Sequence, residues 1–122
     1  MDSNLQEPTK KIPDNIFLVI DKHLLPIKKN LVKIGRHPDN DLIINDPRVS
    51  RYHAQVRFED GQFMVYDMDA KFGTFVNSEP IKKCAVQSGD TISLANTPLL
   101  FINRSSDMVR NIRDTTGLLT EE

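Results

Sequence analysis

Short apolar runs, many of them alternating with polar residues, recur between residues 16 and 103. Short runs of this kind, separated by turn signals, are typical of β-strands. No stretch between these limits has apolar residues at helical spacing. The pattern predicts ten strands, at residues 16–20, 25–28, 31–35, 42–44, 53–58, 62–67, 73–77, 80–83, 90–94 and 98–103. We therefore expect an all-β protein, built as a β-sandwich.

The strongest local signal is a hairpin centred on Asp60 and Gly61. An Asp-Gly pair between two alternating runs favours a tight two-residue turn. In the run before the turn, Ala54, Val56 and Phe58 alternate with polar residues. Because side chains alternate between the faces of a strand, these three residues should face the core.

The two ends of the chain differ from this strand-rich part. Residues 1–13 have no apolar period, so we expect a flexible N-terminal arm before a domain at 14–103. Residues 104–122 are expected to form a tail, or the start of a linker to a further domain. Three apolar residues of the tail have helical spacing and predict a short helix: Met108, Val109 and Ile112.

Composition narrows the function. The 122 residues include 16 basic and 17 acidic ones, and the net charge of −1 argues against nucleic-acid binding. No apolar run is long enough for membrane insertion, and the polar N-terminus lacks a secretory signal. The single cysteine, Cys84, excludes an internal disulfide. We expect a cytoplasmic protein without cofactor or metal.

One motif is compatible with either catalysis or binding. Ser50 and His53 could form a nucleophile and base, oriented by Asp67 or Asp69. However, the serine has no neighbouring glycine, as the sharp turn of a hydrolase would require. The three histidines also lack metal-binding spacing. The residues therefore favour a protein that is not an enzyme.

The same segment suits the binding of an anion. Seven basic and only three acidic residues lie from Lys28 to Arg57, in a chain that is otherwise close to neutral. Arg36 and Arg51 can each donate two hydrogen bonds to a phosphate, and the Ser50 hydroxyl can add another. Loops at one end of a sandwich would bring such groups together.

Three motifs in this order resemble the forkhead-associated (FHA) domain family. They are Gly35-Arg36, then Ser50-Arg51-x-His53, then residues 73–77, which read GTFVN. The resemblance covers about residues 16–103. It implies an FHA-like β-sandwich of about eleven short strands that binds phosphothreonine peptides through its loops and has no catalytic activity. The partner would be a protein phosphorylated by a Ser/Thr kinase.

The resemblance also assigns roles to single residues. Arg36 is similar to the arginine that contacts the phosphate, Ser50 to its hydroxyl donor, and Arg51 to a second basic contact. Four further residues are similar to those that support the binding loops: Gly35, His53, Gly73 and Asn77.

The chain departs from the family's S-x-N-G-T motif, where the asparagine holds the peptide backbone. Here Ala70, Lys71 and Phe72 occupy the first three positions. Phenylalanine has no amide to offer, although Lys71 could contact the phosphate and Phe72 a peptide side chain. The alternative function is a phospho-independent scaffold or dimerisation module. Its discriminating feature is whether Phe72 packs into the core or projects into solvent.

A phosphothreonine ligand could also come from the chain itself. Thr9 lies in the arm, while Thr115 and Thr116 lie in the tail. Each is followed three residues later by an apolar residue, a position that family members often read. A tethered ligand would have a high effective concentration.

Overall fold

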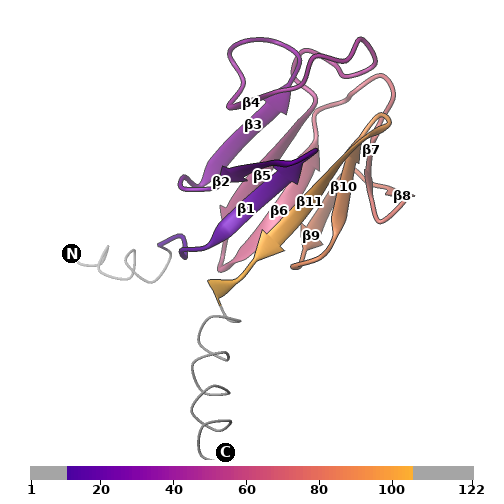
Figure 1. The fold of residues 1–122 in the computed structure, drawn as a ribbon. Helices are drawn as coiled ribbons and strands as arrows, with labels where there is room; N and C mark the ends of the chain where they lie inside the picture. Colours follow the sequence, from indigo (N-terminus) through magenta and orange to yellow (C-terminus); the bar gives the residue numbers. More distant parts are fainter. Residues whose placement is uncertain (1–10, 106–122) are drawn as a thin grey trace, which may run out of the picture.

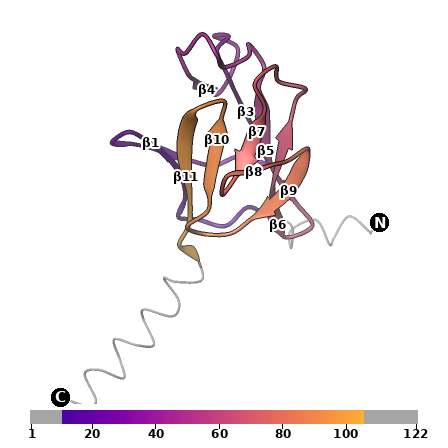
Figure 2. The same cartoon turned by 90° about the vertical axis from the view of Figure 1, so that its right-hand side faces the viewer.

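The computed structural model describes residues 11–105, which form two β-sheets packed face to face (Figures 1 and 2). This part of the chain contains eleven strands. The expected all-β sandwich is confirmed. The sandwich arises because the strands alternate buried and accessible residues, so that each sheet has one apolar face to cover.

Six strands make the first sheet and five make the second. The first sheet has the order β2 (His23–Pro26), β1 (Ile16–Ile20), β11 (Thr97–Asn103), β10 (Thr91–Leu94), β7 (Thr74–Val76), β8 (Glu79–Pro80). The second has the order β4 (Leu42–Ile43), β3 (Leu31–Gly35), β5 (Ala54–Glu59), β6 (Gln62–Asp67), β9 (Lys83–Val86). Neighbouring strands are antiparallel except β3 and β4, which are parallel.

The core fills the space between the sheets. Leu18, Ile92 and Phe101 reach it from the first sheet, and Ile34 and Val65 from the second; all five are fully buried. Burying one such side chain contributes about 1.5–3 kcal/mol relative to leaving it in water. This core holds the strand ends in place, and the loops that connect them are therefore carried on a rigid frame.

The predicted hairpin between β5 and β6 is confirmed. Asp60 and Gly61 both have positive φ, 51° and 82°, as a tight two-residue turn of type I′ requires. The strands pair from Glu59↔Gln62 to Ala54↔Asp67. Ala54 and Val56 face the core, as expected, with Phe58 packed against it.

One predicted strand is wrong. Residues 80–83 were expected to form a single strand, but β8 ends at Pro80 and β9 begins at Lys83, in the opposite sheet. The chain therefore crosses between the sheets at Ile81, whose N–H bonds the Thr74 carbonyl. A two-residue strand such as β8 is too short to show any periodicity, which is why the pattern placed one strand across the crossover and missed residues 84–86 of β9.

The ends of the described chain lie at one end of the sandwich. β11 starts beside the loop after β6, because Ala95 N–H donates to the Gly73 carbonyl at 3.0 Å. It is seven residues long and ends at Asn103, which pairs with Ile16. The start of β1 and the end of β11 are thus far from the loop that holds Gly73 (Figure 1).

The expectations for the two termini fall largely beyond this part of the chain. Residues 1–10 of the predicted arm and residues 106–122 of the predicted tail, with its helix, lie outside the described residues. Between residues 11 and 105, the structure has no helix with the length and apolar character needed to cross a membrane.

Candidate functional site

Three loops meet at the end of the sandwich away from the termini. They are residues 36–41 after β3, 44–53 after β4 and 68–73 after β6. The first two are joined by a hydrogen bond from Arg36 N–H to the Ser50 carbonyl at 3.0 Å. The second and third are joined by a bond from Lys71 N–H to Ser50 Oγ at 3.2 Å. The three loops therefore form one connected unit.

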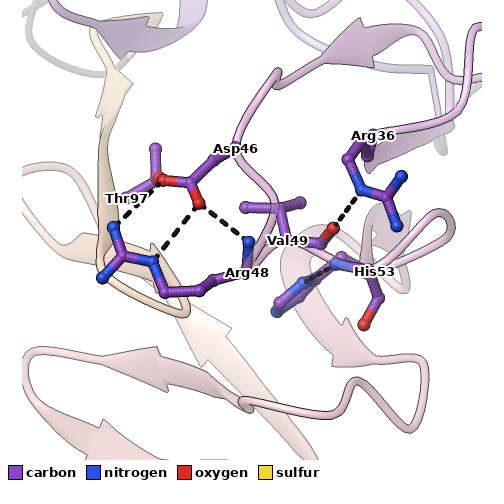
Figure 3. A network of polar contacts seen from close by, with 7 residues as sticks. Arg36, Asp46, Arg48, Val49, His53 and Thr97 are labelled. Carbon is purple, nitrogen blue, oxygen red and sulfur yellow. Dashed lines mark hydrogen bonds and ion pairs between the residues drawn. The ribbon is translucent and has the colours of Figure 1, made fainter.

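Arg36 has a guanidinium group that is fixed on one side. Its Nε donates to the Val49 carbonyl at 2.9 Å, which orients the planar group (Figure 3). Its two terminal nitrogens have no hydrogen bond or ion pair with the described chain, and the residue is exposed. Both terminal nitrogens can thus donate to a ligand without a change of geometry.

Ser50 and Arg51 lie beside Arg36. Ser50 Oγ accepts a hydrogen bond from Lys71 N–H, so its own proton remains available for donation. Arg51 is exposed, and only its backbone is held, with the carbonyl accepting from His37 N–H at 3.1 Å. Together with Lys71, which is also exposed, these residues concentrate positive charge on the loops.

His53 lies beneath the loops and is fully buried. Its Nδ1 accepts from Ser50 N–H at 3.0 Å, so Nε2 carries the proton and donates to the Gly73 carbonyl at 2.8 Å. One ring therefore joins the loops that follow β4 and β6. Burial lowers the pKa of His53 below its usual 6.5, which keeps the ring neutral.

Gly35 allows the close approach of two loops. A Cβ atom at this position would lie 2.2 Å from the Arg51 carbonyl oxygen, closer than any side chain can come. Gly73 meets a different requirement, because its φ of +85° is strained for any residue with a side chain. Both glycines are thus required by backbone geometry beside the candidate site.

Asn77 lies outside this group of residues. It adopts a φ of 51° in the turn after β7, and its side chain bonds Asp90 at 3.0 Å and Thr91 N–H at 2.9 Å. These contacts join the turn after β7 to the turn before β10. The structure therefore brings eight of the nine predicted residues together around the three loops and leaves Asn77 apart.

Phe72 projects into solvent with half of its surface (50%) exposed. The Lys71 ammonium lies 5.5 Å from the centroid of its ring. The ring borders a surface pocket of about 460 Å³, which Ile81 and Lys82 also line. An exposed aromatic ring thus lies next to the cationic loops, where the family's motif has an asparagine.

Two further residues shape the loops but were missed in the sequence. Asn40 is buried and its Nδ2 donates to the carbonyls of His37 and Arg51, at 2.8 and 2.7 Å. Sequence gives little sign of it, because an asparagine in a polar turn normally faces water. Its contacts hold the first loop against the second.

Asp46 is the second missed residue. Its carboxylate accepts from Arg48 N–H at 2.8 Å, Arg48 Nε at 3.4 Å and Thr97 Oγ1 at 3.4 Å (Figure 3). The bonds from Arg48, backbone first, hold the pKa of Asp46 below its usual value. The Asp-Pro pair at 46–47 is a turn signal that could have identified it.

The arrangement supports binding better than catalysis or metal coordination. Both nitrogens of His53 are used in hydrogen bonds to backbone groups, so the ring does not accept a proton from Ser50 Oγ. Among residues 11–105, no three His, Cys, Asp or Glu side chains are grouped so as to hold a metal ion. What the loops offer is a set of hydrogen-bond donors and positive charge.

The described residues form a small β-sandwich module with its hydrogen-bond donors and positive charge on loops at one end. The sequence model of the FHA domain matches residues 32–95, more than half of the chain. The protein belongs to the FHA domain family.

Two curated relatives are similar to about half of this chain. The glycogen accumulation regulator GarA of Mycolicibacterium smegmatis is 41% identical over 68 residues, which cover 56% of this chain and 43% of GarA. The oxoglutarate dehydrogenase inhibitor of Corynebacterium diphtheriae is 43% identical over 68 residues, covering 56% and 48%. The chain thus matches less than half the length of either relative.

Solved structures share the fold. Mycobacterium tuberculosis EmbR in complex with a low-affinity phosphopeptide superposes with a TM-score of 0.69 at 24% identity, covering 71% of this chain and 24% of EmbR. The FHA domain of the CT664 protein from Chlamydia trachomatis gives 0.67 at 18% identity, covering 72% and 96%.

The buried imidazole predicts a pH dependence of stability. Because the folded-state pKa of His53 is lowered, its contribution is complete above about pH 6.5 and is lost as the pH falls through the folded value. We expect the free energy of unfolding to fall between pH 7 and pH 5, by at most about 1.4 kcal/mol per pH unit from this group. Urea denaturation at several pH values measures it.

The control for this prediction is another histidine. His53→Gln should flatten the dependence over this range, whereas His23→Gln should preserve it, because His23 is exposed. An unchanged pH profile in His53→Gln would show that the buried ring is not the source.

Proposed function

We propose that this chain is a phosphothreonine-binding signalling module that recruits phosphorylated protein partners through its three loops. One observation carries the proposal. The guanidinium of Arg36 is held by the Val49 carbonyl with its terminal nitrogens unpaired within the described chain, in the loops that also hold Ser50 and Arg51. These donors are therefore preorganised for binding an anion.

The chemistry of phosphothreonine fits this arrangement. A phosphorylated threonine carries about −1.5 to −2 charges and three strong acceptor oxygens. Arg36 can supply two parallel hydrogen bonds, Ser50 Oγ a third, and Arg51 or Lys71 the remaining charge. Because the donors are already oriented, binding costs little additional ordering.

The relatives support a regulatory role without catalysis. Their names describe a regulator of glycogen accumulation and an inhibitor of oxoglutarate dehydrogenase, and one solved neighbour holds a phosphopeptide. We therefore propose a non-enzymatic cytoplasmic module whose partners are marked by a Ser/Thr kinase. Its boundaries would be those expected from the sequence, with the domain at 14–103, an arm at 1–13 and a tail at 104–122.

Phe72 supports a second candidate. An exposed aromatic ring beside the loops offers an apolar contact instead of an amide. This feature favours a scaffold or dimerisation module that binds partners without phosphate. The two candidates differ in whether binding needs the phosphate group and Arg36.

Loss of the oriented arginine should weaken phosphate-dependent binding. We expect Arg36→Ala to weaken binding of a degenerate phosphothreonine peptide pool by about 1.5–3 kcal/mol, roughly ten- to a hundredfold, since charged hydrogen bonds of this kind are lost. Calorimetric titration of the pool and its unphosphorylated twin measures the effect.

Arg48→Ala is the matched control for this titration. Arg48 lies on the loop of Ser50, but its side chain is paired with Asp46, so the variant should bind as the native protein does. Equal affinities for the phosphorylated and unphosphorylated pools, unchanged in Arg36→Ala, would contradict phosphothreonine binding and support the scaffold.

The asparagine of the family motif can be restored. Phe72→Asn should strengthen phosphopeptide binding by about 1 kcal/mol, or roughly fivefold, because the amide can pair with the peptide backbone. Phe72→Ala should give no gain, as it removes the ring without adding an amide. A loss of affinity in both variants, measured by the same titration, would instead show that the ring itself contacts the peptide.

A ligand within the chain is compatible with the geometry of the sandwich. Thr115 and Thr116 follow Asn103 by 12 and 13 residues, so an extended tail reaches about 40 Å. Thr9 precedes Ile16 by seven residues and reaches only about 24 Å, roughly the length of β11. We therefore favour the tail threonines over Thr9 as self-ligands.

Phosphorylation of the tail should then close the site. We expect a chain phosphorylated at Thr115 or Thr116 to lose affinity for an added phosphopeptide at least tenfold, because the tethered ligand occupies the loops first. Titration of phosphorylated and unphosphorylated chains measures the difference. Equal affinities, with the phosphorylated chain monomeric, would exclude self-binding.

A further inference from the structure

The outer face of the first sheet carries an apolar surface on β2, β1 and β11. On β2, β1 and β11 the residues that point away from the core form two rows across the strands. The rows, set by the strand register, are Leu24–Val19–Leu100 and Pro26–Phe17–Ile102. We call these six residues the outer apolar face. Each lies opposite its row neighbour, so their side chains are in contact distance of one another.

This face differs from an ordinary solvated sheet surface. Antiparallel sheets with one face in water usually show polar residues on that face. Here none of the six residues is polar, while Leu24 is 60% exposed and Leu100 is 36% exposed. Exposed apolar residues that are contiguous in this way mark a surface that binds something.

The size of the face argues against a second copy of the chain. A stable interface between proteins buries about 800 Å² on each partner and involves roughly 20–30 residues a side. Six residues on three strands are too few for that. The face is suited to one short amphipathic segment, since three strands are about 10 Å across and a nine-residue helix is about 13 Å long.

The chain supplies such a segment next to the face. Ile102, near the end of β11, is part of the face. Two residues later, the Arg104 N–H donates a hydrogen bond to the Asn15 carbonyl at 2.9 Å. Residues 106–122 follow, and their sequence places Met108, Val109 and Ile112 at helical spacing. Met108 is only four residues from Arg104, so it can lie within about 14 Å of that anchor.

The tether gives this segment an advantage over any free partner. A short linker of this kind corresponds to an effective concentration in the millimolar range. An apolar contact whose intrinsic Kd lies below this concentration is then largely occupied. We propose that the outer apolar face is the docking site of the chain's own segment 106–114, which covers it through Met108, Val109 and Ile112. The proposal does not rest on phosphate binding by the loops, and it concerns the unphosphorylated chain, in which Thr115 and Thr116 are not ligands of the loops.

Hydrogen exchange of the full-length, unphosphorylated chain tests this docking. We expect the amides of residues 108–114 to exchange more slowly than in an unstructured peptide. Leu100→Asp should raise their exchange rate about tenfold, equivalent to roughly 1.4 kcal/mol of lost docking free energy. Ile112→Asp should have the same effect from the other side of the contact.

The matched control is Leu31→Asp. Leu31 is 40% exposed, like Leu100, but lies on β3 in the second sheet. The Leu31→Asp substitution should leave the exchange rates of the tail amides unchanged. In every variant, slow exchange of the amides of β5 and β6 shows that the sandwich is folded. The proposal would be overturned if the tail amides of the native chain exchanged as fast as those of an unstructured peptide. Sedimentation tests the alternative occupant. If the native chain is a dimer, and Leu100→Asp makes it monomeric while Ile112→Asp does not, the face binds a second copy of the chain and the proposal is overturned.

Discussion

The loops of this protein depend on the hydrogen bonds of one buried imidazole. His53 accepts from Ser50 N–H and donates to the Gly73 carbonyl, and these two bonds together allow only one neutral tautomer. If the ring were protonated at Nδ1, two N–H groups would face each other in a site without water access, so burial and geometry act in the same direction. The positions of Ser50 and of the third loop follow from this ring, and the Arg36 backbone in turn bonds the Ser50 carbonyl. The donors therefore have fixed positions, which is the condition for binding an anion at little entropic cost.

The sequence predicted most of the fold because the fold is made of short-range patterns. Short apolar or alternating runs identified β1, β3 and β6 at their observed bounds, and Asp60-Gly61 identified the hairpin. The separation of β8 from β9 could not be predicted, since two residues carry no period.

The candidate site was predicted less completely, for a different physical reason. Arg36 and Ser50 belong to short motifs, and the structure places them side by side. Asn40 and Asp46 act through side-chain bonds to loops that are distant in the sequence, and no local pattern encodes such contacts. Gly35 was expected to allow tight geometry, but only the structure shows that the neighbouring group is the Arg51 carbonyl.

The positions of the chain ends determine how the module can be handled and displayed. β1 begins and β11 ends at the end of the sandwich opposite the loops (Figure 1). A protein or a surface joined directly before β1 or directly after β11 would therefore add bulk where it does not shield Arg36 and Ser50. Immobilised at one of these two points, the domain would present its cationic loops outward to a partner in solution. Attachment through the loops would hide them, even though the strands would remain intact.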